Sequence, residues 1–91
     1  MAFKGMNKLL KEFWKDLEEI GVNNDIILLA INVEEELIAI KYQCRTATIP
    51  LWFFYQLWEK LMDYNLTADV QVNILKAGEY REIEVLITHR K

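Results

Sequence analysis

Two stretches with a similar pattern of apolar and polar residues lie 44 residues apart in the sequence. Residues 10–26 read LKEFWKDLEEIGVNNDI, and residues 54–70 read FYQLWEKLMDYNLTADV. Their alignment places Gly21 over Asn65, and both residue types readily adopt the left-handed conformation that ends many helices. Each stretch has the pattern of an amphipathic helix that leads into a strand. The agreement between the two predicts an internal repeat.

Two helices are expected at about residues 7–20 and 49–64, because apolar residues recur there every three or four positions. The apolar stripe of the first helix is Met6, Leu9, Leu10, Phe13, Trp14, Leu17 and Ile20. The apolar stripe of the second helix is Leu51, Phe54, Tyr55, Leu57, Trp58, Leu61 and Met62. This helical phase predicts that Trp58 is buried. It places Trp52 on the polar side and Phe53 at the border, so Trp52 is expected to be the most exposed tryptophan.

Four strands, in two hairpins, are expected where apolar residues run together or alternate with polar ones. They span residues 26–33, 37–44, 68–75 and 81–88. Pairing Asn32 with Leu37 would direct one set of large residues toward the helices. The outer face of the first hairpin would then carry Ile26, Leu28, Ala30, Leu37 and Ala39. The second hairpin would add Leu75, Tyr80 and Leu86 to that outer face.

The order helix, hairpin, helix, hairpin predicts an α+β fold of αββαββ type. We expect a two-layer sandwich in which both helices cover one face of a four-stranded, mainly antiparallel sheet. Residues 1–91 would form a single domain, with a first αββ unit at 1–44 and a second at 45–91. The order of the strands is left open. The element order is similar to that of small acidic α+β chaperones such as those of type III secretion, a resemblance that involves no particular residue.

Composition and charge exclude several classes of function. The chain of 91 residues has a net charge of −3 and a sequence pI of about 5.1, which disfavours general attraction to nucleic acid or anionic lipid. Cys44 is the only cysteine, so no disulfide can form within the chain, which fits a reducing compartment. The N-terminal residues are charged and lack the apolar core of a signal peptide. No apolar run approaches the roughly 20 residues of a bilayer span. A cytoplasmic protein without membrane contact is therefore expected.

Signals of catalysis are weak. The three glycines form no phosphate-binding loop, and the lone Cys44 and lone His89 provide no metal set. Carboxylates gather at residues 34–36 and on the last strand, where solvent would keep them in their ordinary ionised state. We therefore expect no enzyme, no cofactor and no metal.

The leading hypothesis is a small acidic, non-enzymatic protein–protein interaction module that forms a homodimer. An adaptor, a chaperone-like protein or an inhibitor would fit. It depends on a hydrophobic content of 53%, high for a small monomer, and on a first hairpin that is apolar on both faces. The partner-binding candidates are Trp52, Phe53, Ile26, Leu28, Leu37 and Leu86. In the alternative interpretation, Trp52 contacts its own chain by folding back over a strand edge or the loop at 46–48.

A second hypothesis is a nucleic-acid-associated protein that contacts phosphates through one face of the first helix. The candidate residues are Lys4, Lys8, Lys11 and Lys15. Nucleic acid is disfavoured because carboxylates share this helix and no aromatic residues for base stacking interleave the lysines. An enzyme ranks third.

Overall fold

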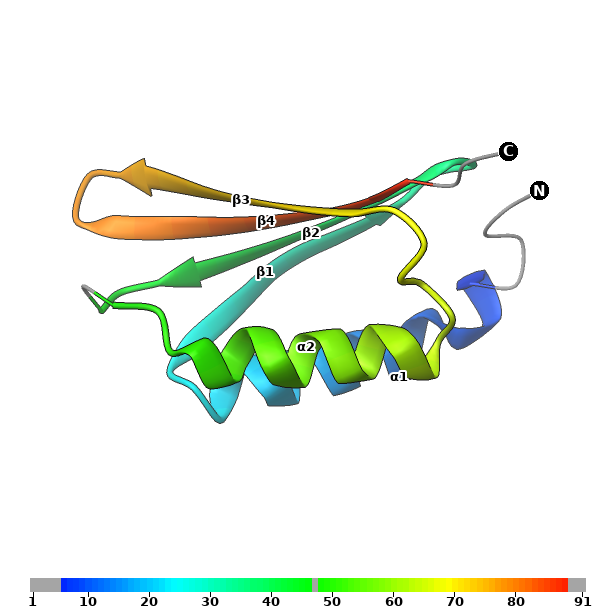
Figure 1. Ribbon diagram of the computed structural model, residues 1–91, viewed down its shortest axis with the longest axis horizontal. Coiled ribbons are helices and arrows are strands. Elements are labelled where there is room, and N and C mark those ends of the chain that lie inside the picture. Colours follow the sequence, from blue (N-terminus) through cyan, green and yellow to red (C-terminus); the bar gives the residue numbers. More distant parts are fainter. Residues whose placement is uncertain (1–5, 47, 89–91) are drawn as a thin grey trace.

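The computed structural model describes residues 6–46 and 48–88. These residues form two helices and four strands in the order αββαββ, as predicted (Figure 1). The elements are α1 (Met6–Val22), β1 (Ile26–Val33), β2 (Leu37–Cys44), α2 (Leu51–Asp63), β3 (Val70–Ala77) and β4 (Tyr80–Thr88).

The described strands make one antiparallel sheet with the order β1-β2-β4-β3. The two hairpins meet through their second strands, so β2 and β4 are central and β1 and β3 form the edges. Ile40 of β2 pairs with Val85 of β4. These residues occupy equivalent positions of the two αββ units when the sequence is shifted by 45. The sheet thus has the arrangement expected of a repeated unit that meets its copy across a local two-fold axis.

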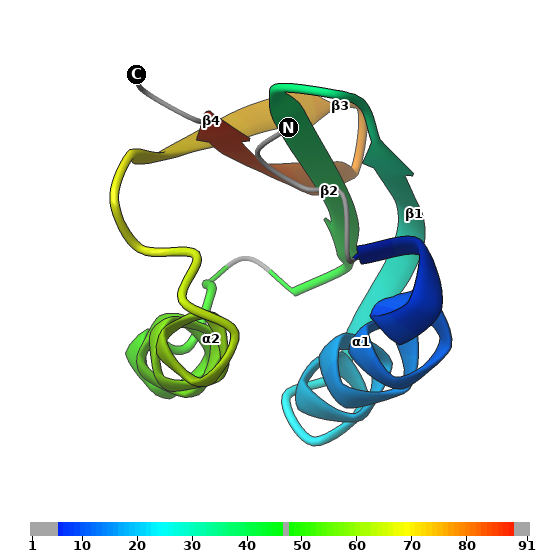
Figure 2. The same ribbon diagram turned by 90° about the vertical axis from the view of Figure 1, so that its right-hand side faces the viewer.

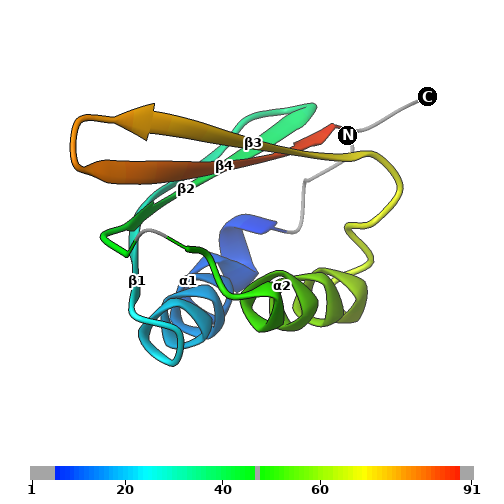
Figure 3. The same ribbon diagram turned by 60° about the vertical axis from the view of Figure 1, so that its left-hand side comes forward.

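Both helices lie on one face of the sheet, side by side beneath it (Figures 2 and 3). The backbone of α1 runs close to β1, whereas α2 runs close to α1 and approaches the strands at isolated positions at most. β3 is the strand farthest from the helix layer in Figure 1. The core lies between α1, α2 and the three strands β1, β2 and β4. Its largest fully buried side chains are Tyr42, Phe13, Phe53, Leu17, Ile26, Ile38, Ile40, Leu61, Ile83, Ile87, Val85 and Cys44.

The first hairpin differs from the predicted register in two ways: the pairing near the turn is shifted by two residues, and β1 contains a bulge farther from the turn. Leu28 pairs with Tyr42 and Ala30 with Lys41, so Leu29 has no partner between them. Such an extra residue reverses the alternation of side chains along a strand. Ile26 and Leu28 consequently face the helices. The prediction that they lie on the outer face is wrong, and the predicted pairing of Asn32 with Leu37 is replaced by Asn32 with Ala39.

Gly21 does not end its helix in a left-handed conformation, since α1 continues to Val22. Asn65 does have a positive φ of 57°, as predicted, whereas in the first half Asp25 takes this role with a φ of 58°. Gly21 is instead required by close packing. A Cβ atom there would collide with the carbonyl oxygen of Ile26 and lie 3.1 Å from a ring carbon of Tyr42. Glycine therefore permits α1 to pass close over the start of β1.

Candidate protein-binding surface

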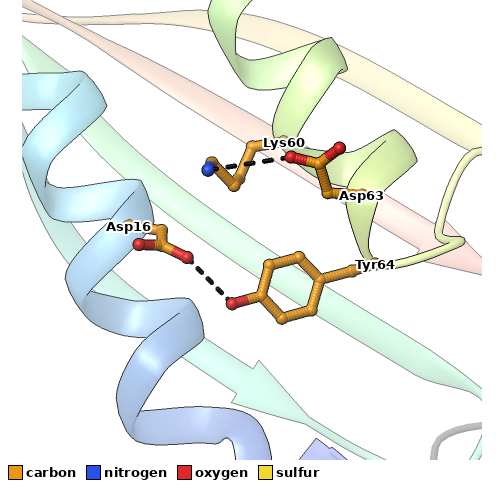
Figure 4. A network of polar contacts seen from close by, with 4 residues as sticks. All are labelled: Asp16, Lys60, Asp63 and Tyr64. Carbon is orange, nitrogen blue, oxygen red and sulfur yellow. Dashed lines mark hydrogen bonds and ion pairs between the residues drawn. The ribbon is translucent and has the colours of Figure 1, made fainter.

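The rotation of α2 about its axis is set by contacts with α1 and the sheet. The Tyr64 hydroxyl donates a hydrogen bond of 2.9 Å to Asp16 of α1 (Figure 4). The Tyr64 ring also meets Phe13 edge-on, with 4.9 Å between centroids. On the same side of α2, the Asn24 amide donates to the side-chain oxygen of Gln56 at 2.8 Å. The ring of Phe53 meets Tyr42 of β2 edge-on at 4.9 Å.

These contacts bury a different face of α2 from the one predicted. The fully or nearly fully buried residues of α2 are Phe53, Leu57 and Leu61. Phe53 is 0% exposed, so its prediction as a partner-binding residue is wrong. Trp58 is 46% exposed, and its predicted burial is also wrong. The reason is that α2 carries apolar residues over a wide arc, and packing against α1 as well as the sheet rotates the buried part of that arc toward α1.

The remaining part of the arc is an exposed apolar stripe. Its residues recur at intervals of four, three and four, which aligns them along the helix. They are Leu51, Tyr55, Trp58 and Met62, all among the exposed large hydrophobic residues. Trp52 extends the stripe, because its ring stacks on Tyr55 with 5.3 Å between centroids and 6° between planes. Trp52 is 60% exposed and is the most exposed of the three tryptophans, as predicted.

An uncovered part of the sheet lies on the same side of the molecule as this stripe. Val72 and Ile74 of β3 pair with Val85 and Ile83, which are buried beneath the helices. Paired residues share a face of the sheet, so Val72 and Ile74 point toward the helix layer. Both are nevertheless exposed, because within the described residues the two helices approach β3 at isolated positions at most. At 100° per residue, the stripe lies on the side of α2 away from Gln56 and hence away from α1, which packs against the opposite edge strand, β1.

We call Leu51, Trp52, Tyr55, Trp58, Met62, Val72 and Ile74 the α2–β3 surface. Each of these seven residues is 43–83% exposed, so together they expose on the order of 800 Å² if a fully exposed large side chain presents about 150–250 Å². The largest apolar patch of a typical monomer is about 300–600 Å². A standard protein interface covers about 800 Å² on each partner. The α2–β3 surface thus has the size and the aromatic content of a protein interface.

The outer face of the sheet is a weaker candidate than predicted. Leu37 and Leu86 do lie on this face, but both are partly buried. Between the apolar residues lies a polar group in which Lys41 pairs with Glu84 and the Asn73 amide donates to Glu84 at 3.2 Å. Ile26 is 1% exposed and Leu28 is also buried, so neither can contact a partner in this state. Of the six predicted partner-binding residues, Trp52 alone belongs to the α2–β3 surface.

The lysines of the nucleic-acid hypothesis are described in part. Lys11 and Lys15 are exposed on α1, with Glu12, Glu18 and Glu19 exposed on the same helix. Lys4 lies outside the described residues. Lys8 lies within α1, but its side chain is outside the described part of the chain. The described part of the lysine stripe is therefore a mixed-charge surface.

Two tyrosines among the described residues have raised pKa values, and the lone cysteine is buried. No cluster of three or more His, Cys, Asp or Glu side chains suited to a metal ion occurs among the described residues. The thiol of Cys44 is buried and lies 3.1 Å from the hydroxyl of Thr46, and His89 lies outside the described residues. Burial raises the pKa of Tyr42. Burial, the hydrogen bond to Asp16 and nearby carboxylates raise the pKa of Tyr64 to about 12. Both tyrosines donate structural hydrogen bonds, Tyr42 to the carbonyl oxygen of Leu17 at 2.7 Å.

A cavity of about 450 Å³ opens at the edge of β1, where α1 ends. Its walls are Glu18, Val22, Asp25, Ile26, Ile27, Leu28, Arg45 and Thr46. The side chains of Ile26 and Leu28 are buried, so the cavity follows the edge of the strand. It combines an apolar wall with two carboxylates and one guanidinium group. No buried, unpartnered polar atom is found among the described residues that would indicate a particular ligand.

Comparisons with protein-family profiles, with curated proteins and with solved structures give no match. Within the described residues, neither helix is both long and apolar enough to cross a membrane. The α2–β3 surface is therefore the candidate functional site.

Sequence reasoning missed most of this surface. Periodicity placed Leu51, Tyr55, Trp58 and Met62 in one broad stripe with Phe54, Leu57 and Leu61, and the whole stripe was assigned to the core. The width of the apolar arc could have indicated an exposed stripe. Phe53, Leu57 and Leu61 form a second stripe on the same helix. A helix that must cover one sheet needs only one of them.

Proposed function

We propose that this protein is a non-enzymatic protein–protein interaction module whose binding surface is the α2–β3 surface. One observation supports the proposal most strongly. An exposed aromatic helix stripe and an uncovered strand face lie on the same side of a small domain and together have the area of a standard interface. Trp and Tyr are enriched among the residues that dominate binding energies, and Trp52, Tyr55 and Trp58 supply three of them.

The proposal includes a homodimer that acts in the cytoplasm. The lone Cys44 supports a reducing compartment, since its thiol is buried and hydrogen-bonded like that of a small core residue. A homodimer is supported by the size of the α2–β3 surface, because a monomer seldom exposes so large an apolar patch to solvent. A nucleic-acid role is the weaker alternative, because the α2–β3 surface carries no cation and the described lysines of α1 are interspersed with carboxylates.

The test is site-specific photo-crosslinking in living cells that express the protein. A photoreactive phenylalanine analogue replaces Tyr55 in one variant and Lys41, which is exposed on the outer face of the sheet, in the control variant. We expect a discrete protein adduct from position 55 and none from position 41. The adduct is identified by mass spectrometry, and a second copy of this chain counts as a partner.

A matched pair of substitutions makes this test specific. Ile74 and Leu75 are neighbours in β3 with similar exposure, 53% and 47%, but they lie on opposite faces of the sheet. Ile74→Glu should abolish the adduct from position 55, and Leu75→Glu should leave it unchanged. No adduct from position 55, or an adduct equally sensitive to both substitutions, would refute the proposed function.

A further inference from the structure

The α2–β3 surface has a symmetry that points to a particular occupant. In Leu51, Tyr55, Trp58 and Met62 the intervals are four, three and four, so the stripe reads the same in both directions along α2. Two such stripes can lie together in antiparallel orientation, with a two-fold axis level with residues 56 and 57. Leu51 then faces Met62 of the partner subunit, and Tyr55 faces Trp58 of the partner subunit.

We propose that a second copy of this chain covers the α2–β3 surface, with the two α2 helices packed antiparallel across a two-fold axis. This inference depends on the proposed function and names its partner. A contact of this kind is isologous, because each copy uses the same residues, and it closes at two subunits. The exposed area, on the order of 800 Å² for each copy, matches what a standard interface needs.

The uncovered strand face fits the same arrangement. An α-helix with its side chains is about 10 Å across and covers about two strands of a sheet, since neighbouring strands lie about 4.8 Å apart. Here α1 lies against β1, and α2 is drawn toward α1 by the contacts of Tyr64 and Asn24. Val72 and Ile74 of β3 therefore lack a covering helix. The partner's α2 would lie along α2 on the side away from α1 and cover these two residues. Across the two-fold axis, α2 would cover the same strand face of the partner.

The charges of α2 favour the antiparallel over the parallel orientation. Glu59, Lys60 and Asp63 all lie in the C-terminal half of α2, and the N-terminal half carries no charge. In a parallel pair, Glu59 at the margin of the stripe would approach the same carboxylate of the other copy. An antiparallel pair moves them to opposite ends of the interface. It also opposes the two helix dipoles.

Disulfide trapping tests the orientation with residues at the two ends of the stripe. Leu51→Cys and Met62→Cys proteins are prepared separately, mixed in equal amounts and treated with oxidised glutathione. We expect a linked dimer that contains one copy of each variant, because an antiparallel seam brings these positions to the Cα separation of about 4.4–6.8 Å that a disulfide requires. Val22→Cys, exposed at the C-terminal end of α1, is the control and should form no link with either variant. Wild-type protein, whose Cys44 is buried, should also remain unlinked.

Each other outcome contradicts the inference in a recognisable way. A link within the Leu51→Cys sample alone would indicate parallel helices. No link in the mixture would mean that α2 does not face α2. If the mixture fails while photo-crosslinking at position 55 yields an adduct with a different protein, the inference and the homodimer are wrong, and the proposal that the α2–β3 surface binds a protein stands. If position 55 yields no adduct, both are wrong.

Discussion

The hydroxyl group of Tyr64 at the end of α2 lies 2.9 Å from a carboxylate oxygen of Asp16 in α1 (Figure 4). This hydrogen bond and the edge-on packing of Tyr64 on Phe13 hold α2 against α1 and determine which of its two apolar stripes is exposed. Tyr64→Phe keeps the ring and removes the hydrogen bond. We expect it to lower the free energy of unfolding by about 0.5–1.5 kcal/mol, since the hydrogen bond is only partly buried. Urea denaturation measures this, and a wild-type midpoint would show that the contact is dispensable.

Stability should fall at alkaline pH because two tyrosines hold their protons more tightly in the folded state. Burial raises the pKa of Tyr42, and burial with the Asp16 contact raises the pKa of Tyr64 to about 12, from the usual tyrosine value of about 10. The folded state therefore binds more protons than the unfolded state above pH 10. The stabilisation is complete below pH 10 and is lost as the pH rises from 10 toward 12. Thermal melts across this range should show a steadily falling Tm, with a shallower fall in Tyr64→Phe. A Tm independent of pH up to 12 would contradict this prediction.

Two residues of α2 should differ strongly in their contribution to stability. Phe53 is fully buried against Tyr42, so Phe53→Ala should cost about 3–5 kcal/mol. Trp58, the larger side chain, is nearly half exposed, and Trp58→Ala should cost the monomer only about 1–2 kcal/mol. Chemical denaturation at concentrations low enough to keep the protein monomeric measures both. The reverse order of costs would mean that the rotation of α2 is the one predicted from the sequence.

Gly21 should resist substitution because of close packing. Gly21→Ala places a methyl group against the carbonyl oxygen of Ile26 and should lower the free energy of unfolding by about 1–3 kcal/mol. Gly78→Asn is the control. Gly78 has a φ of 65°, which asparagine tolerates, and a Cβ there points into open space. Its substitution should change the free energy of unfolding by less than about 1 kcal/mol. Equal effects of the two substitutions would contradict the packing argument.

Much of the fold could be predicted from the sequence, but the exposed surface could not. Periodicity located both helices and all four strands, and Asn65 was correctly expected to have a positive φ. The bulge at Leu29 escaped prediction because Ile26 to Ile31 are all apolar, so either alternation looks equally favourable. The strand order also escaped, since either strand of each hairpin could have been central.

The rotation of α2 illustrates a more general reason. Local periodicity states which residues of a helix share a side, but the neighbours in the tertiary structure decide which side is buried. In α2 two apolar stripes were available, and contacts with residues far away in the sequence, Asp16 and Asn24, decided between them. Trp52 was predicted to be exposed because the helical phase places it on the polar side of α2. Val72 and Ile74 could not be recognised, because their exposure depends on where α2 lies.

The masses of three proteins in solution show whether a second copy of the chain covers the α2–β3 surface. Sedimentation equilibrium is run on wild type, Ile74→Glu and Leu75→Glu at the same concentrations. If a second copy covers the α2–β3 surface, wild type and Leu75→Glu sediment with twice the chain mass of 10.9 kDa, and Ile74→Glu sediments with the chain mass. A wild-type protein that stays monomeric at high concentration, or an Ile74→Glu protein that dimerises as well as Leu75→Glu, would contradict the claim.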